Sequence, residues 1–167
     1  MIQANVAVVG SDGRVRDRFF NRVMFPIKDE QGQCIAFGGR VIGKGEPKYL
    51  NSQETPLFHK GRMLYALDKA KAAMASTGVA VVSEGYTDVI AMHEAGIRNA
   101  VATLGTALTR THIRVLSRHA RNRIVYLFDG DAAGQRAADR ALQFIDSSMT
   151  PEAGAARIDL FAVTLPD

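Results

Sequence analysis

The sequence predicts an α/β domain with a mainly parallel sheet over residues 78–167, preceded by a smaller basic α+β lobe in residues 1–77. Two observations lead to this prediction. Short, β-branched apolar runs alternate with longer segments in which apolar residues recur every three or four positions. Acidic residues lie just beyond two of the apolar runs. Strands buried on both faces and joined by crossover helices have this pattern, and ligands bind at the carboxyl ends of such strands.

The first part has the features of short strands and turns. Residues 23–28 and 33–40 flank a polar turn that ends in Gly32, which is typical of a β-hairpin. Glycines and a proline exclude a helix from residues 43–47. Residues 63–74 are rich in Leu, Ala, Lys and Met, and we expect them to form a helix that leads into the second part.

In the second part the expected elements alternate. The predicted strands are residues 79–82, 100–102, 124–128 and 158–163. The predicted helices are residues 86–95, 109–119 and 131–145. This order predicts a parallel sheet with right-handed crossovers.

Composition excludes several classes of protein. Apolar residues make up 47% of the 167 residues, which is typical of a globular chain. No run approaches the roughly 20 apolar residues of a membrane span, and no signal peptide is recognisable, so we expect a cytoplasmic location. Cys34 is the only cysteine, which excludes an internal disulfide or a thiolate zinc site. The net charge of +4 and the excess of basic residues over positions 14–62 are compatible with binding phosphates.

Carboxylates follow two of the predicted strands. Glu84 and Gly85 lie just beyond the first strand, and Asp88 falls in the first turn of the next helix, where the helix dipole favours a negative charge. Taken alone, Asp88 fits a surface acid equally well. Asp129 and Asp131 end another buried run, with oxygens that can converge on one hard cation. A lone Asp-Gly-Asp triplet is usually a turn, but four acids at neighbouring strand ends would repel one another without a metal.

The expected ion is Mg²⁺, with Mn²⁺ as a substitute, because the ligands are few and all are oxygen. The metal would polarise a phosphoryl oxygen, with Glu84 as candidate acid or base. A calcium loop that starts at Asp129 fails, since its twelfth position is Arg140 where a glutamate is needed. A P-loop over residues 38–45 fails too, since Gly45 stands where Ser or Thr should hold the metal.

The same residues carry a resemblance. Glu84-Gly85-Tyr86 with Asp88, followed by residues 128–131, resembles the Toprim fold of bacterial primases, topoisomerases and certain nucleases. Further segments resemble the catalytic core of bacterial replicative DNA primases, in the family's order: residues 22–27, 37–40, 47–52, 58–61, 64–65 and 104–106. The similarity extends from about residue 14 to residue 167.

This resemblance implies an RNA polymerase that copies single-stranded DNA into short primers from ribonucleoside triphosphates. It implies that the metals are held by Glu84, Asp88, Asp129 and Asp131. It also implies that basic and polar residues of the first lobe line the nucleotide and template groove, here Arg18, Arg22, Arg40, Lys48, Asn51 and Lys60. Such cations match a triphosphate and an acidic template.

The sequence departs from the family at both ends. The family's last acidic motif continues beyond Asp167 with further aspartates, so we expect a Toprim domain truncated at its carboxyl end. The family's zinc domain, most of its amino-terminal core lobe and its helicase-binding domain lie outside this sequence. Two alternatives stay open: a Toprim nuclease or topoisomerase, and a non-catalytic fragment that binds nucleic acid or nucleotides.

Overall fold

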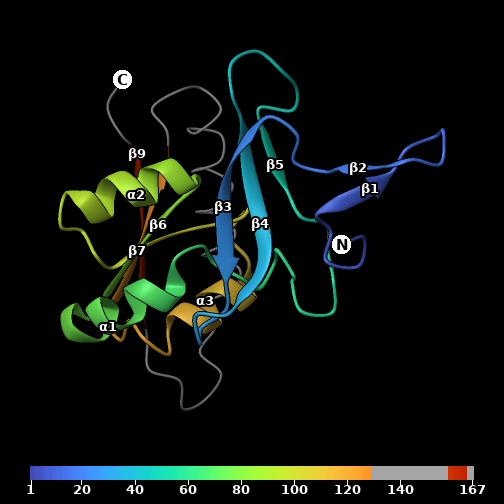
Figure 1. The fold of residues 1–167 in the computed structure, drawn as a ribbon. Helices are drawn as coiled ribbons and strands as arrows, with labels where there is room; N and C mark the ends of the chain where they lie inside the picture. The colour runs from blue at the N-terminus through green and yellow to red at the C-terminus, as the bar shows by residue number, and fades with distance from the viewer. Residues whose placement is uncertain (129–157, 165–167) are drawn as a thin grey trace. The chain divides into compact units, whose positions relative to one another are not determined.

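The computed structural model describes residues 1–128 and 158–164 (Figure 1). The chain forms two compact units, Met1–His59 and Lys60–Asp167, which are described separately below. No helix in the described ranges is long and apolar enough to cross a membrane.

The first unit consists of two small antiparallel sheets. The two-stranded sheet pairs β1 (Ala7–Val9) with β2 (Val15–Asp17), and the three-stranded sheet has the order β3 (Arg22–Lys28), β4 (Cys34–Val41) and β5 (Tyr49–Asn51). The expected hairpin is confirmed as β3 and β4. Its turn is held by the Asp29 carboxylate, whose Oδ1 accepts from the backbone N–H groups of Gln31 and Gln33 at 3.0 and 2.9 Å.

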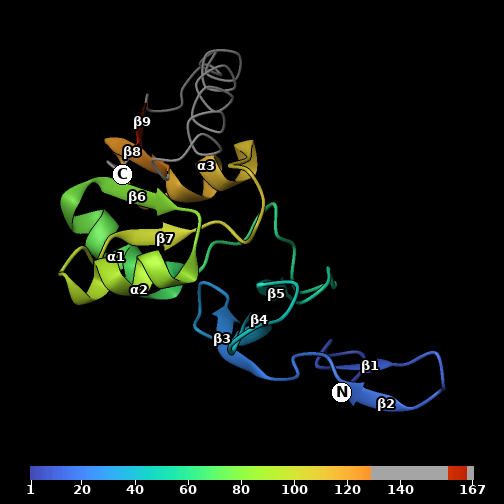
Figure 2. The same ribbon diagram turned by 90° about the horizontal axis from the view of Figure 1, so that it is seen from above.

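The second unit contains the predicted parallel sheet. Its elements in chain order are α1 (Leu67–Thr77), β6 (Val79–Ser83), α2 (Tyr86–Glu94), β7 (Ala100–Ala102), α3 (Arg110–Leu116), β8 (Arg123–Phe128) and β9 (Asp159–Thr164). The strands lie side by side in the order β7-β6-β8-β9, and all their pairings are parallel (Figure 2). The predicted helix over residues 131–145 lies outside the described residues.

Helices pack against both faces of this sheet. Ala80, Val82, Ile124 and their neighbours on one face form a buried core with apolar residues of α1 and α3. On the other face, Ala102 packs with Val89 of α2. Opposite placement of α2 and α3 is the expected result of two right-handed crossovers that run in opposite directions along the sheet.

The helix α1 begins four residues later than expected, at Leu67 rather than residue 63. Residues before it pair with the sheet instead: the Tyr65 N–H donates to the Ala102 carbonyl at 2.8 Å, and the Ala102 N–H donates to the Tyr65 carbonyl at 3.3 Å. Ala66 then takes a left-handed conformation, with φ of 63°. The helix is capped by Gly78, also left-handed with φ of 73°, where a Cβ would collide with the Asn122 side chain, so that glycine is favoured on both counts.

The packing of α1 also explains where the compact units divide. Leu67, Ala70 and Met74 of α1 belong to the same core as β6 and β8. The helix α1 therefore lies within the second compact unit, which begins at Lys60, and the domain boundary expected at residues 77 and 78 stays a prediction. A helix that precedes a sheet in sequence joins it in space when its apolar face has no other core to cover.

Candidate active site at the carboxyl edge of the parallel sheet

The connections from β6 and β8 leave the sheet in opposite directions, because β6 leads to β7 on one side and β8 leads to β9 on the other. β6 and β8 are direct neighbours, with Val82 opposite Tyr126. Their carboxyl ends therefore flank the switch point of the sheet, which is where open α/β sheets bind ligands. Glu84 is the first residue after β6, and Asp129 is the first residue after β8 in the sequence.

The Glu84 side chain is exposed at this edge. Its charge acts on Tyr126 of the neighbouring strand β8, which is buried. Burial is the main cause that raises the pKa of the Tyr126 hydroxyl, and the negative charge of Glu84 raises this pKa further, while a hydrogen bond with Thr103 opposes the shift. This agrees with the strand register, in which Val82 lies opposite Tyr126 and Glu84 follows two residues later.

Asp88 folds back over the beginning of α2. Gly85 caps this helix in an extended conformation, with φ of −119°, and Asp88 lies in the first turn. A Cβ on Gly85 would meet Oδ2 of Asp88 at 2.7 Å, which is closer than real Cβ contacts come. Gly85 is thus needed for the position of the Asp88 carboxylate rather than for an unusual backbone angle.

The remaining two acids of the predicted site, Asp129 and Asp131, lie outside the described residues. Within residues 1–128 and 158–164, no three His, Cys, Asp or Glu side chains are grouped closely enough to hold a metal ion. Glu84 and Asp88 supply oxygen donors on the β6 side, so a complete magnesium site would require the acids that follow Phe128.

Two polar residues near this edge of the sheet, Thr103 and Tyr126, were not singled out from the sequence. Thr103, directly after β7, is buried, and its N–H donates to the Ser83 carbonyl at 3.1 Å. Tyr126 of β8, which forms a hydrogen bond with Thr103, is the second such residue. Neither residue has a local sequence signal, because their relation to Glu84 depends on strand register.

The predicted basic and polar residues of the first unit are divided between the two faces of its three-stranded sheet. Arg40 lies opposite Val23 and Tyr49, which places its side chain on the same face as Asn51. Arg22, next to Val23, points to the other face, where its Nη1 donates to the carbonyls of Gly39 and Lys48 at 3.3 and 3.4 Å.

The other members of this group make contacts of their own. Arg18 donates from Nη2 to the Asn51 carbonyl at 3.3 Å. The Lys48 ammonium and the Arg40 guanidinium each lie 5.9 Å from the centre of the Tyr49 ring. Within the first unit, Arg18 and Arg22 are therefore hydrogen-bonded to the backbone carbonyls of Asn51 and Lys48, respectively. Lys60 belongs to the second unit.

Comparison with known proteins identifies the family. Residues 1–71 match the family model described as the DNA primase catalytic core, N-terminal domain, and residues 78–157 match the Toprim domain model. The chain is 53% identical over 146 residues to a DNA primase of Pseudomonas aeruginosa and 51% identical over 143 residues to that of Escherichia coli. The chain belongs to the DNA primase family. These alignments cover 87% and 86% of this chain, but only 22% and 24% of the relatives.

Solved primase structures share the fold. A DNA primase domain from Pseudomonas aeruginosa superposes with a TM-score of 0.86 at 47% identity, covering 100% of this chain and 51% of that one. The structure described as the DnaG primase catalytic domain bound to ssDNA gives a TM-score of 0.84 at 46% identity, covering 99% of this chain and 52% of that one. The predicted α/β Toprim fold, with antiparallel strands before it, is thereby confirmed.

Proposed function

We propose that this chain is the part of a DNA primase that carries out nucleotidyl transfer, making short RNA primers on single-stranded DNA. The observation that carries this proposal is the placement of Glu84 at the carboxyl end of β6, beside the end of β8, after which Asp129 and Asp131 follow in the sequence. The match of residues 1–71 to a primase-specific domain favours this activity over the nuclease or topoisomerase activities of other Toprim proteins. The single-stranded DNA bound by a solved relative supports the same template here.

Toprim and primase proteins use a divalent metal, and the donors described here fit one. Glu84 and Asp88 offer carboxylate oxygens, which hard divalent cations prefer. We propose Mg²⁺, replaceable by Mn²⁺, held by Glu84 and Asp88 together with Asp129 and Asp131. When bound, the ion would neutralise charge on the phosphates of the incoming nucleotide.

In the proposed reaction the 3′ hydroxyl of the primer attacks the α-phosphorus of a ribonucleoside triphosphate, and pyrophosphate leaves. Glu84 takes part as candidate acid or base for the hydroxyl proton. Lys48 or Lys60 neutralises the triphosphate, and catalysis then consists mainly of positioning and charge stabilisation.

The remaining proposed contacts are with nucleotide and template. They are assigned to Arg18, Arg22, Arg40 and Asn51, in the lobe that we place before residue 78. We also propose that full-length proteins of this family associate with a replicative helicase. A cytoplasmic location is proposed as well, because DNA replication takes place there in bacteria.

The proposal predicts the effect of Asp129→Asn on primer synthesis. Loss of one charged ligand should lower ribonucleotide incorporation on single-stranded DNA by at least about 100-fold, as expected when an electrostatic contact to the transition state is lost. The rate is measured with labelled ribonucleotides and Mg²⁺. Asp159→Asn is the matched control, because Asp159 is exposed at the opposite, amino end of the same sheet.

Undiminished incorporation by Asp129→Asn would contradict the assigned site. Metal-dependent cleavage of DNA without incorporation would instead show a Toprim nuclease. Template binding without any turnover would show a non-catalytic nucleic-acid-binding fragment.

A further inference from the structure

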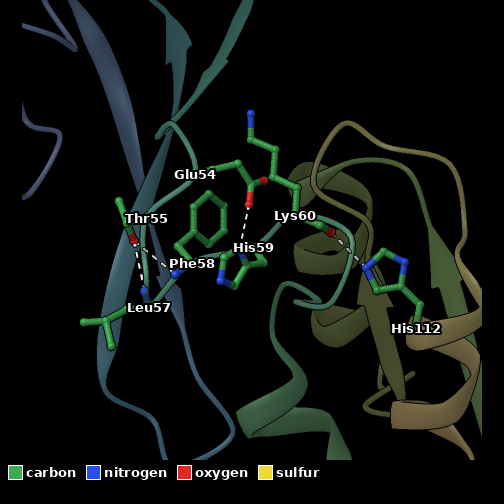
Figure 3. A network of polar contacts seen from close by, with 7 residues as sticks. All are labelled: Glu54, Thr55, Leu57, Phe58, His59, Lys60 and His112. Atoms are coloured by element: carbon green, nitrogen blue, oxygen red, sulfur yellow. Dashed lines mark hydrogen bonds and ion pairs between the residues drawn. The ribbon is translucent and has the colours of Figure 1, made fainter.

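Two side chains at the amino end of α3, those of its N-cap Thr109 and of His112, hold the backbone of Lys60 and Gly61 at the beginning of the second unit. His112 Nε2 donates to the Lys60 carbonyl at 2.9 Å, and Thr109 Oγ1 donates to the Gly61 carbonyl at 2.7 Å. These contacts join positions 52 and 48 residues apart in the sequence. Two consecutive carbonyls are thus fixed at the beginning of one helix. Figure 3 shows the contact between the Lys60 carbonyl and His112.

The hydrogen bonds of His112 define its tautomer. Thr109 caps α3: its hydroxyl accepts from the His112 N–H at 3.1 Å, and its own N–H donates to Nδ1 of His112 at 3.2 Å. Because Nδ1 accepts a hydrogen bond, the ring proton is on Nε2, which donates to the Lys60 carbonyl. Burial lowers the pKa of the His112 imidazole, which keeps this neutral form at neutral pH, although the backbone hydrogen bonds with Lys60 and Met63 oppose the shift.

This arrangement exceeds what helix capping requires. In a capping box the third residue is usually Glu or Gln, whose side chain serves only the helix end. A histidine at this position has a second ring nitrogen on its far side, and here that nitrogen reaches Lys60. His112 is fully buried, so its ring has no freedom to release this contact without opening the core.

The side chain of Lys60 leaves the anchored backbone in another direction. Figure 3 shows the Lys60 carbonyl pointing toward His112 while the ammonium end of the chain extends away from the imidazole. The hydrogen bond from His112 therefore fixes the backbone of Lys60, and the charged ammonium group takes no part in this bond. A backbone held in this way reduces the conformational entropy that a bound phosphate would otherwise have to remove.

We propose that His112, assisted by Thr109, is a positioning residue that holds the Lys60 backbone so that its ammonium group is placed to bind the triphosphate of the incoming nucleotide. This inference rests on the proposed function, in which Lys60 binds nucleotide. It assigns a role in substrate affinity to a buried histidine of α3. This histidine lies outside both acidic motifs, Glu84 to Asp88 and Asp129 to Asp131.

The test is a titration of the full chain with ATP in the presence of Mg²⁺, comparing Lys60→Ala, His112→Leu and His112→Gln. Lys60→Ala and His112→Leu should each weaken ATP binding by about 10- to 100-fold, the range expected when a binding group is misplaced. His112→Gln should restore most of the affinity, because one amide supplies both an acceptor for Thr109 and a donor for Lys60. Affinity for single-stranded DNA should change less than ATP affinity in every variant.

The control is His93→Leu, which removes a similar contact elsewhere in the same unit. His93 Nε2 lies 2.9 Å from the Ala100 carbonyl, and its loss should leave ATP binding unchanged. If His112→Leu does not fold, Thr109→Val replaces it, because this nearly isosteric change removes only the hydroxyl that holds Gly61 and caps α3.

The outcomes separate the inference from the proposed function. In the double variant Lys60→Ala with His112→Leu, binding should be no weaker than in Lys60→Ala alone, because His112 acts through Lys60. Normal ATP binding in both His112→Leu and Thr109→Val, with weak binding in Lys60→Ala, would overturn the inference and leave the proposed function standing. Normal binding in Lys60→Ala would overturn the nucleotide-binding role of Lys60 and the inference with it.

Discussion

Glu84→Gln should lower primer synthesis by about 100- to 1,000-fold, because it removes a negative charge from the site while keeping the size of the side chain. Glu84 is exposed at the end of β6, so the free energy of unfolding should change by no more than about 0.5 kcal/mol. Ribonucleotide incorporation measures the first effect, and urea unfolding measures the second.

The control for this substitution is Glu94→Gln. Glu94 is also exposed and lies at the far end of α2 from the proposed site, so its loss of charge should leave synthesis unchanged. A second measurement checks the geometry: because the charge of Glu84 raises the pKa of Tyr126, the variant should titrate Tyr126 at lower pH in an NMR experiment. Full activity of Glu84→Gln would remove Glu84 from the mechanism.

Gly85→Ala should weaken Mg²⁺ binding by about 10- to 100-fold, the effect typical of disturbing the support of a metal ligand. The backbone angle of Gly85 is acceptable to alanine, so the obstacle is the Asp88 carboxylate, 2.7 Å from the new methyl group. A carboxylate end moves easily, and stability should therefore fall little while the ligand is displaced. Calorimetric titration with Mg²⁺ and thermal unfolding measure the two effects separately.

A double variant distinguishes this explanation from a general disturbance of α2. If Gly85→Ala acts by displacing Asp88, adding it to Asp88→Ala should weaken Mg²⁺ binding no further. Additive losses would show that the methyl group acts through something other than Asp88, and unchanged affinity in Gly85→Ala would show that Asp88 is not a ligand in this position.

The sequence predicts the parallel sheet well because its signals are local. The strands of the second unit are short and mostly apolar, and β6, β7, β8 and β9 begin within one residue of their expected positions. The hairpin of the first unit follows from its polar turn in the same way. The family resemblance rests on motifs at the ends of these elements, and the comparisons confirm the family.

What the sequence did not predict depends on contacts between distant residues. Pairing of Tyr65 with Ala102 delays the start of α1, and no nearby residue indicates it. The position of His112 is similar, since Thr109-x-x-His112 has the spacing of a capping box, but its bond to Lys60 exists only in the folded chain. Of the four predicted acids, Glu84 and Asp88 are placed by the structure, and Asp129 and Asp131 lie outside the described residues.

Register likewise divides the predicted basic groove. Arg22 and Arg40 lie on opposite faces of the sheet because they occupy adjacent positions across β3 and β4. The pairing of a hairpin decides this, and the residue types alone do not. A contribution of both residues to substrate binding stays a prediction.

Calorimetric titration of Mg²⁺ into the chain in the presence of a ribonucleoside triphosphate, repeated with Glu84→Gln, tests the central claim most directly. The account predicts saturable binding to the unaltered chain and its loss in the variant, with both chains folded. Absence of binding to a folded chain, or equal binding in the variant, would contradict a metal-dependent site at the carboxyl ends of β6 and β8.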